Sequence, residues 1–311
     1  MQLDSSSHLA DRSEPLPRGR PVFDNFFGEP PREYYVYVPQ SAGQDASVTV
    51  LVHGISCNAA EQLLRFVDEA ERHGTILVAP LFERTKYGKY QQVIDPKLGI
   101  RADLALLDII EKVAMRAGVD GSRFNLFGFS GGSQFAHRFV MLHPDRVISC
   151  VCASAGWYTF PVEERGYPQG MGTHPIDDGS FDPTAIASVP IHVLVGERDI
   201  AQDASVRASP GLVRRQGATR LERAERWFRA MQQWSLHPAS TLSHIPKAGH
   251  RFGAAATRHG LAALVFERFN LTQQFEGELG AGDRKVADFE RTKLQSEKLI
   301  SAPKTNWRGR R

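Results

Sequence analysis

Cysteine and long apolar runs are both scarce in this sequence. The 311 residues include three cysteines, an odd number that does not support a disulfide-stabilised fold. No stretch approaches the roughly 20 apolar residues that a helix needs to cross a bilayer. The polar, proline-rich start, MQLDSSSHLADRSEPLPRGRP, lacks the apolar core of a secretory signal. We therefore predict a cytoplasmic protein without a membrane span.

An excess of charge is also missing from most of the chain. The formal net charge is +3, and residues 283–311 alone carry nine Lys and Arg against four Asp and Glu. The remainder is thus close to neutral, which argues against the strongly basic groove typical of nucleic-acid binding. We expect no nucleic-acid partner, and the composition leaves the oligomeric state open.

The sequence does contain a regular alternation of two hydrophobic patterns. Short apolar runs are typical of strands, and longer stretches with apolar residues at helical spacing are typical of amphipathic helices. The expected strands are residues 33–39, 47–54, 75–80, 122–129, 146–155, 190–199 and 240–246, and the expected helices are residues 61–74, 102–118, 131–144, 217–234 and 254–269. Several strands are apolar throughout, which indicates a parallel sheet covered on both faces.

This pattern predicts the α/β fold class and three segments of different character. A doubly wound, mostly parallel sheet with helices on both faces is expected over residues 21–272. Residues 1–20 are expected to form a flexible arm, and residues 273–311 a polar, basic tail. Residues 155–189 are an insertion between two expected strands, and we predict that this insertion roofs the site.

Polar residues follow four of the expected strands. His53 and Gly54 come after one strand, and Ser130 lies in the sequence GFSGG after another. Asp199 and His250 follow two later strands. Because the carboxyl ends of parallel strands share one edge of a sheet, these side chains are expected to meet there. A serine hydroxyl needs a base beside it and a third group that orients the base, so this set predicts nucleophilic acyl transfer.

The sequence GFSGG matches the G-x-S-x-G nucleophile elbow, and the order serine, aspartate, histidine is similar to that of the α/β-hydrolase superfamily. The HG turn, the run SRFNLFGFSGGS and the following HPDRV resemble bacterial serine esterases related to polyhydroxybutyrate depolymerases and feruloyl esterases. The resemblance covers about residues 30–270. It implies hydrolysis of a small-molecule or polymeric carboxylic ester through an acyl-enzyme, with no metal and no cofactor. A serine peptidase or acyltransferase with the same triad, and a non-catalytic binding protein of the same fold, are the alternatives.

The three catalytic roles are assigned by position along the chain. Ser130 is predicted to be the nucleophile, at a sharp turn between a strand and a helix. The base has to follow the acid, which leaves His237, His244, His250 and His259. Of these four, His250 alone follows its strand through a glycine turn, and we predict that His250 is the base.

Two aspartates compete for the role of the acid. Asp199 comes three residues after Gly196, directly after a strand, where its carboxylate is able to orient the imidazole. Asp203 lies four residues further on and is the alternative. We predict that Asp199 is the acid.

The remaining candidates concern the oxyanion and the substrate. The resemblance implies that the backbone amides of Ile55 and Gly131 form an oxyanion hole and that His53 organises this loop beside the substrate. Trp157 and Tyr158, in the insertion, are expected to bind an apolar or aromatic part of the substrate. Ordinary loop packing is the other interpretation of these two aromatic residues.

Overall fold

The computed structural model describes residues 14–176, 179–202, 206 and 208–275. The chain divides into two compact units, Met1–Phe269 and Asn270–Arg311. Of the second unit, residues 270–275 are described and are helical, and the expected basic tail from residue 276 onward lies outside the described residues. The sheet and the candidate site belong to the first unit.

An eight-stranded sheet runs through the described part of the first unit in the order β1-β2-β4-β3-β7-β8-β9-β10. The strands are β1 (Pro21–Phe26), β2 (Arg32–Tyr37), β3 (Val48–Val52), β4 (Ile76–Pro80), β7 (Phe124–Phe129), β8 (Val147–Ala153), β9 (Ile191–Gly196) and β10 (Thr241–Ile245). β2 pairs antiparallel with both β1 and β4, and the pairs from β4 across to β10 are parallel. The carboxyl ends of the parallel strands therefore share one edge of the sheet.

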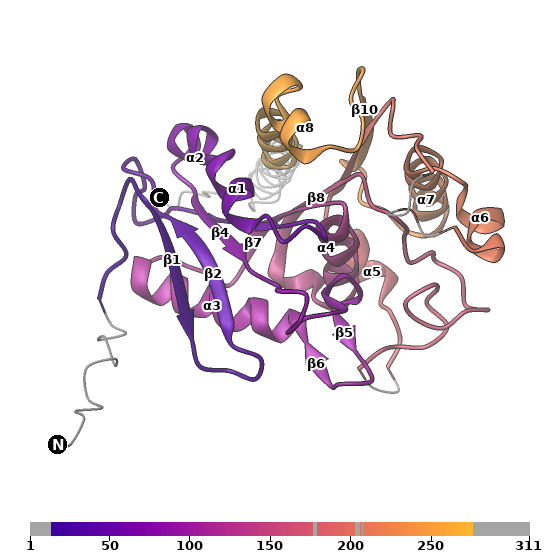
Figure 1. Cartoon of the computed structure of the whole chain (residues 1–311), viewed down its shortest axis with the longest axis horizontal. Helices are drawn as coiled ribbons and strands as arrows, with labels where there is room; N and C mark the ends of the chain where they lie inside the picture. Colours follow the sequence, from indigo (N-terminus) through magenta and orange to yellow (C-terminus); the bar gives the residue numbers. More distant parts are fainter. Residues whose placement is uncertain (1–13, 177–178, 203–205, 207, 276–311) are drawn as a thin grey trace, which may run out of the picture. The chain divides into compact units, whose positions relative to one another are not determined.

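Helices cover both faces of this sheet (Figure 1). One core cluster is shared by α3 (Ala102–Ala117), α4 (Gly131–Leu142) and α7 (Arg220–Trp234), and the other by α1 (Ala59–Leu64), α2 (Val67–His73) and α8 (Phe252–Arg258). Along β3, Val50 and Val52 belong to the first core and Leu51 to the second. Burial of both faces explains why the strand is apolar throughout. The predicted doubly wound, mostly parallel α/β sheet is confirmed.

Shorter elements fill the connections. They are η1 (Tyr90–Gln92), β5 (Ile94–Asp95), β6 (Ile100–Arg101), η2 (Pro144–Arg146), α5 (Pro183–Ala187) and α6 (Pro210–Gln216). β5 and β6 pair as a separate two-stranded sheet. Among the described residues, no helix combines the length and the apolar character that crossing a membrane requires.

Some elements differ from the sequence-based expectations. The helix expected over residues 61–74 is divided into α1 and α2. The helix expected over residues 254–269 is interrupted after α8 by Gly260, whose φ of 61° is left-handed and ends a helical run. β1 is not predicted, because its residues alternate between exposed and partly buried positions and give only a weak apolar signal.

The folded part of the chain begins before residue 21. Residues 1–13 of the expected arm lie outside the described residues. Leu16, however, is buried in the first core, and Arg18 forms a bridge with Val38. Apolar burial and backbone pairing thus hold the later part of the expected arm against the sheet.

Candidate active site

Ser130 occupies the turn between β7 and α4 in a backbone conformation that side chains rarely adopt. Its φ is 54° and its ψ is −108°, in a region that is strained for a residue other than glycine. The Ser130 backbone N–H donates to the carbonyl oxygen of Ala153, at the end of β8, over 2.8 Å. This bond holds the strained turn at the carboxyl edge of the sheet.

The glycines around Ser130 are required by close backbone approach. A Cβ on Gly128 would overlap the backbone of Gly132, and a Cβ on Gly132 would overlap the carbonyl of Val52 in β3. A Cβ on Gly131 would lie 2.7 Å from the hydroxyl of Tyr90. The elbow therefore closes only because side chains are missing at these positions.

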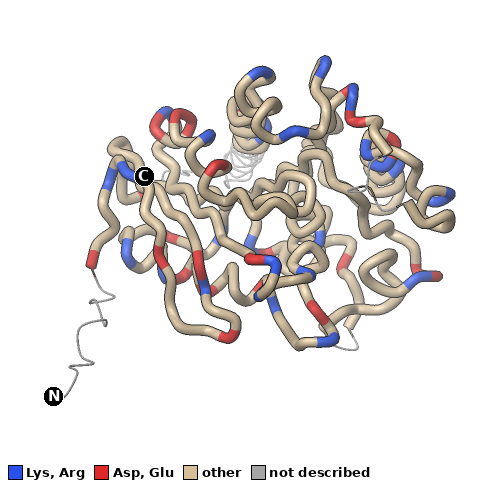
Figure 2. Tube along the Cα trace, viewed as in Figure 1, with Lys and Arg blue, Asp and Glu red and all other residues tan. Residues whose placement is uncertain are grey.

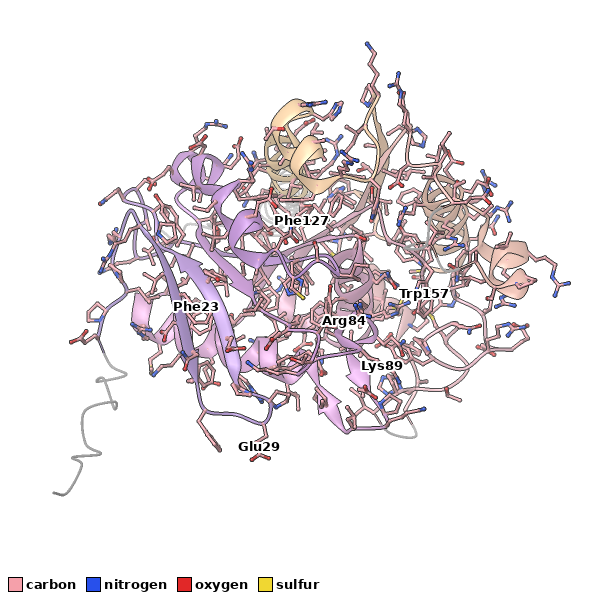
Figure 3. All side chains as sticks on the ribbon, viewed as in Figure 1. Phe23, Glu29, Arg84, Lys89, Phe127 and Trp157 are labelled. Carbon is pink, nitrogen blue, oxygen red and sulfur yellow. The ribbon has the colours of Figure 1, made fainter. Side chains whose placement is uncertain are left out.

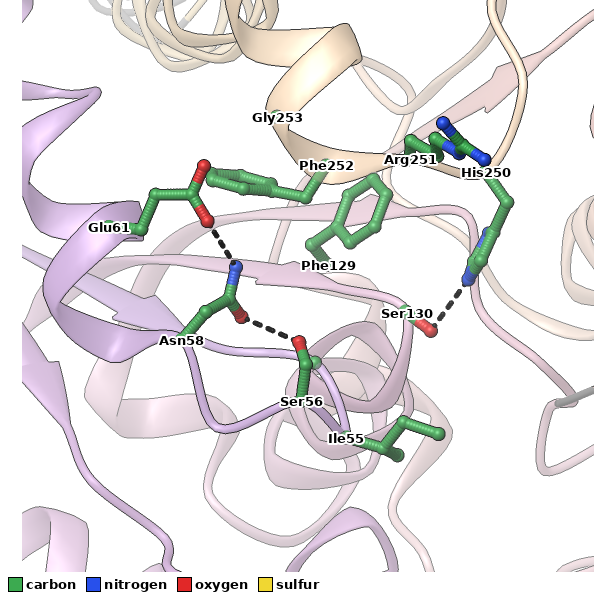
Figure 4. A pocket seen from close by; sticks show the side chains of 11 residues that line it. Ile55, Ser56, Asn58, Glu61, Phe129, Ser130, His250, Arg251, Phe252 and Gly253 are labelled. Atoms are coloured by element: carbon green, nitrogen blue, oxygen red, sulfur yellow. Dashed lines mark hydrogen bonds between the residues drawn. The ribbon is translucent and has the colours of Figure 1, made fainter.

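Three side chains from distant parts of the chain meet at this edge. The Oγ of Ser130 lies 3.0 Å from Nε2 of His250 (Figure 4). Nδ1 of His250 lies 2.9 Å from Oδ2 of Asp199. Asp199 is fully buried, whereas the His250 side chain is 22% exposed. If Ser130 donates to Nε2, the proton on the neutral ring is at Nδ1, which donates to Asp199.

The turns after β9 and β10 are joined by backbone contacts. The N–H of Arg198 donates to the carbonyl of Ala248 over 2.8 Å, and a Cβ on Gly196 would overlap that same carbonyl. The N–H of Asp199 donates to the carbonyl of Gly196 over 3.0 Å, which tightens its turn. These bonds place the carboxylate of Asp199 against the ring of His250.

The other candidates for base and acid are placed elsewhere or are not described. His244 lies in β10 with Nε2 3.1 Å from a carboxylate oxygen of Glu225, and His237 accepts from the N–H of Ala239 over 3.1 Å. His259 ends α8. The alternative acid, Asp203, lies outside the described residues.

Ile55 and Gly131 lie side by side next to Ser130. A Cβ on Gly131 would be 3.1 Å from Cγ2 of Ile55. Gly131 is the first residue of α4, and the first amides of a helix lack acceptors within the helix and carry the positive end of its dipole. The neighbourhood of the two residues is therefore suited to a developing negative charge.

His53 is enclosed by the backbone. Its ring is fully buried, with Nδ1 2.7 Å from the carbonyl oxygen of Gly54 and Nε2 accepting from the N–H of Phe82 over 3.0 Å. Burial lowers the pKa of His53 to about 4, so the ring is neutral at pH 7. The Tyr90 hydroxyl donates to the His53 carbonyl over 2.9 Å. Both ring nitrogens of His53 are therefore engaged with the backbone of this loop, and the buried ring does not line the cavity beside Ser130.

A cavity of about 380 Å³ opens beside Ser130 and His250. Along one side, the Ser56 hydroxyl donates to Asn58 over 3.1 Å and the Asn58 amide donates to Glu61 over 3.3 Å. Phe129 and Phe252 add two aromatic rings to the lining, and Figure 4 shows the Phe252 ring beside the carboxylate of Glu61. The cavity therefore combines polar and aromatic lining next to the candidate nucleophile.

The two aromatic residues predicted to bind substrate do not line this cavity. Trp157, labelled in Figure 3, is buried beneath the guanidinium of Arg138, which lies 4.1 Å from its ring centroid. Tyr158 is fully buried and stacks on Trp227 with centroids 4.7 Å apart. Their packing fits the second interpretation, loop packing. The aromatic lining comes from Phe129, directly before Ser130, and from Phe252, two residues after His250.

The described residues contain no group of three or more His, Cys, Asp or Glu side chains arranged to hold a metal ion.

A second, smaller cavity of about 160 Å³ also has Ile55 in its lining, together with Cys57, Arg84 and Tyr90, among others. Its walls provide one exposed guanidinium next to the proposed oxyanion loop. The side chains that meet beside the first cavity supply a serine hydroxyl, an imidazole and a carboxylate.

The architecture defines the chain as a protein of the α/β-hydrolase fold, and solved structures of this fold resemble it. Poly(aspartic acid) hydrolase-1 from Sphingomonas sp. KT-1 is 22% identical with a TM-score of 0.68, over 80% of this chain and 99% of that chain. The poly(3-hydroxybutyrate) depolymerase LpqC from Bordetella parapertussis is 24% identical with a TM-score of 0.66, over 80% and 90% of the two chains. A ferulic acid esterase is 17% identical with a TM-score of 0.58, over 82% and 98%.

These similarities are similarities of fold. No family model matches the sequence, and no curated protein matches it significantly. The expected likeness to depolymerases and feruloyl esterases of the α/β-hydrolase fold is confirmed at the level of the structure.

Proposed function

We propose that this chain is a serine hydrolase that cleaves carboxylic esters through an acyl-enzyme intermediate. The observation that carries the proposal is the continuous contact from Ser130 Oγ to His250 Nε2, 3.0 Å, and from His250 Nδ1 to Asp199 Oδ2, 2.9 Å. A hydroxyl, an imidazole and a buried carboxylate in this order are the groups that a serine nucleophile requires. The fold of the neighbouring hydrolases supports the same chemistry by analogy.

In the first half of the reaction, Ser130 Oγ attacks the ester carbonyl while His250 Nε2 accepts the hydroxyl proton. Asp199 holds the imidazole in the tautomer with a proton on Nδ1 and stabilises the positive charge that forms on the ring. The backbone amides of Ile55 and Gly131 are the proposed donors to the oxyanion, each typically worth about 3 kcal/mol of barrier. The imidazolium then donates its proton to the leaving alcohol, and the acyl group remains on Ser130.

In the second half, a water molecule takes the place of the alcohol. His250 accepts a proton from this water as it attacks the acyl carbonyl, and the second tetrahedral intermediate collapses to release the acid and restore Ser130. No step needs a cofactor or a metal. We place the reaction in the cytoplasm.

The cavity beside Ser130 indicates what kind of group the ester carries. Its volume of about 380 Å³ fits a small group or one end of a polymer. Phe129 and Phe252 suit an apolar part of that group, and Ser56, Asn58 and Glu61 suit hydroxyl or carbonyl groups on it. We therefore propose esters whose acyl or alcohol group combines an apolar part with oxygen-bearing groups.

The test combines covalent labelling with substrate profiling. A fluorophosphonate probe is expected to label the wild-type protein and the Ser133→Ala control but not Ser130→Ala. Ser133 is a matched control because it is a buried serine one turn further into α4 and does not line the cavity. Hydrolysis of p-nitrophenyl esters should follow the same pattern, and labelling of Ser130→Ala would exclude Ser130 as the nucleophile. Turnover of peptide p-nitroanilides, or acyl transfer to added alcohols, in place of ester hydrolysis would indicate a peptidase or an acyltransferase.

A further inference from the structure

The two oxygens of the Asp199 carboxylate contact two different partners. Oδ2 lies 2.9 Å from His250 Nδ1, and Oδ1 lies 3.2 Å from Nη1 of Arg220. The Arg220 side chain is 1% exposed and that of Asp199 is completely buried. A buried guanidinium therefore contacts the candidate acid on the side away from the base.

The fold attaches the beginning of α7 to Asp199 in two ways. The backbone N–H of Leu221 donates to the carbonyl oxygen of Asp199 over 3.3 Å, in addition to the side-chain contact from Arg220. The Thr219 hydroxyl caps the helix by accepting from the N–H of Glu222 over 3.2 Å. A cation in the first turn of a helix is unfavourable with respect to the helix dipole, and the contact with the negatively charged Asp199 offsets this effect.

We propose that Arg220 is a positioning residue of the triad, which fixes the Asp199 carboxylate and favours the neutral form of His250. Because Arg220 holds Oδ1, the other carboxylate oxygen, Oδ2, stays directed at Nδ1 of His250. The positive charge of Arg220 also offsets part of the negative charge with which Asp199 favours imidazolium. The consequence is that the pH profile of activity depends on the charge of Arg220, although Arg220 does not line the cavity. This inference rests on the proposed function.

The other charged groups around His250 differ from Arg220 in exposure. Arg198 and Lys247, on the turns after β9 and β10, are exposed, as is Arg251, next to His250. Glu197 is also exposed and accepts from the N–H of Lys247 over 2.9 Å, and Glu61 lies across the cavity. Figure 2 shows basic positions around the ends of β10 and α8. Because water and salt screen exposed charges, these groups act on the imidazole more weakly than a buried charge in contact with Asp199.

Arg223 provides a matched control on the same helix. It is as buried as Arg220 and one turn further along α7. Its guanidinium donates to the backbone carbonyls of Gly217, over 2.9 Å, and Gly156, over 2.5 Å. Substitution of Arg223 therefore disturbs the packing of α7 while the contact between Arg220 and Asp199 is kept.

The experiment measures kcat/KM for a p-nitrophenyl ester, and the rate of fluorophosphonate labelling, against pH. The acid limb of each profile is the range of low pH over which the rate rises. For Arg220→Gln, this limb should move to higher pH by about one unit, because a positive charge near the imidazole is lost. For Arg220→Lys, which keeps the charge but replaces the rigid, planar guanidinium with a flexible ammonium, the limb should stay in place while kcat falls about threefold to tenfold and KM is little changed. For Arg223→Gln, the limb should stay at the wild-type position.

Coincident acid limbs for Arg220→Gln and the wild type would overturn the inference, as would an equal shift in Arg223→Gln. Far-UV circular dichroism and thermal melting show whether each variant is folded. If Arg220→Gln does not fold, Arg220→Lys decides the question, because a wild-type kcat or an upward shift of its limb contradicts the proposed role. A wild-type protein that neither hydrolyses esters nor reacts with the probe would instead refute the proposed function.

Discussion

The ring of Phe129 lies against the imidazole of His250, with centroids 5.4 Å apart and planes inclined by 28°. Phe129 also meets Phe252 edge to face, with centroids 5.3 Å apart. The residue before the candidate nucleophile thus supports the candidate base from one side, while Asp199 holds its Nδ1 over 2.9 Å. The elbow therefore fixes two parts of the site at once: the serine and the plane of the imidazole.

Phe129→Leu should lower kcat about twofold to tenfold, because an aromatic contact of this kind contributes about 0.5–1.5 kcal/mol and leucine leaves the imidazole free to tilt. Phe252→Leu is the control, since Phe252 lines the cavity without a stacking contact to His250. It should raise KM for apolar esters and leave kcat within about twofold. Steady-state kinetics distinguishes the two effects, and equal losses of kcat in both variants would contradict a supporting role for Phe129.

The sequence carries enough information to predict the elbow and the base because parallel strands force their ends to one edge. Ser130 and His250 follow strands whose apolar patterns are clear, so their proximity needs no knowledge of loop packing. The direction of the Phe129 side chain, by contrast, is not predictable from the strand pattern. It depends on how the strained turn, with a φ of 54° at Ser130, meets the loop of His250, and no local pattern encodes that meeting.

Burial by distant elements explains why Trp157 and Tyr158 of the insertion pack away from the cavity. Tyr158 stacks on Trp227, and the indole of Trp227 donates to the carbonyl of Thr159 over 2.7 Å. These partners are almost 70 residues apart in the chain. An aromatic residue in a loop gives the same sequence signal whether it faces a substrate or a helix such as α7. The contact of Arg220 with Asp199 is hidden for the same reason.

Gly132→Ala should destabilise the fold by about 3 kcal/mol or more, because its Cβ overlaps the carbonyl of Val52 and β3 and α4 have to separate. Gly43→Ala is the control: its Cβ meets its nearest neighbour, the backbone nitrogen of Asp45, only at 4.0 Å. That variant should change the free energy of unfolding by about 0.5 kcal/mol or less. Urea titration followed by tryptophan fluorescence measures both, and similar losses would show that the close approach at Gly132 is not the cause.

Asp199→Asn should lower kcat by up to roughly 10⁴-fold, because the amide favours the wrong imidazole tautomer. It should also lower the free energy of unfolding by about 3 kcal/mol, since a buried negative charge beside Arg220 is lost. Asp203→Asn, a change at the alternative acid, should leave kcat within a few-fold. Kinetics and urea titration of both variants test this. If Asp203→Asn lost most of its kcat while Asp199→Asn kept it, Asp203 would be the acid instead of Asp199.

The pKa of His53, which burial lowers to about 4, makes stability depend on pH in a definite direction. In the unfolded chain a histidine takes up a proton near pH 6.5, whereas native His53 takes it up only near pH 4, so unfolding binds a proton between these values. The stabilisation is complete above pH 6.5 and is lost as the pH falls towards 4. The shift corresponds to about 3 kcal/mol.

His53→Gln should therefore lose less stability than the wild type between pH 7 and pH 4, although it is less stable at pH 7 because two buried backbone contacts are altered. The change in the free energy of unfolding that remains between pH 7 and pH 4 comes in part from His192, whose pKa is also lowered to about 4 by burial. His244→Gln is the control for the removal of a histidine as such, because its side chain is 43% exposed and not buried like that of His53. Urea titrations at both pH values measure the slopes. A His53→Gln slope equal to that of the wild type would mean that the ring does not stay neutral in the native loop.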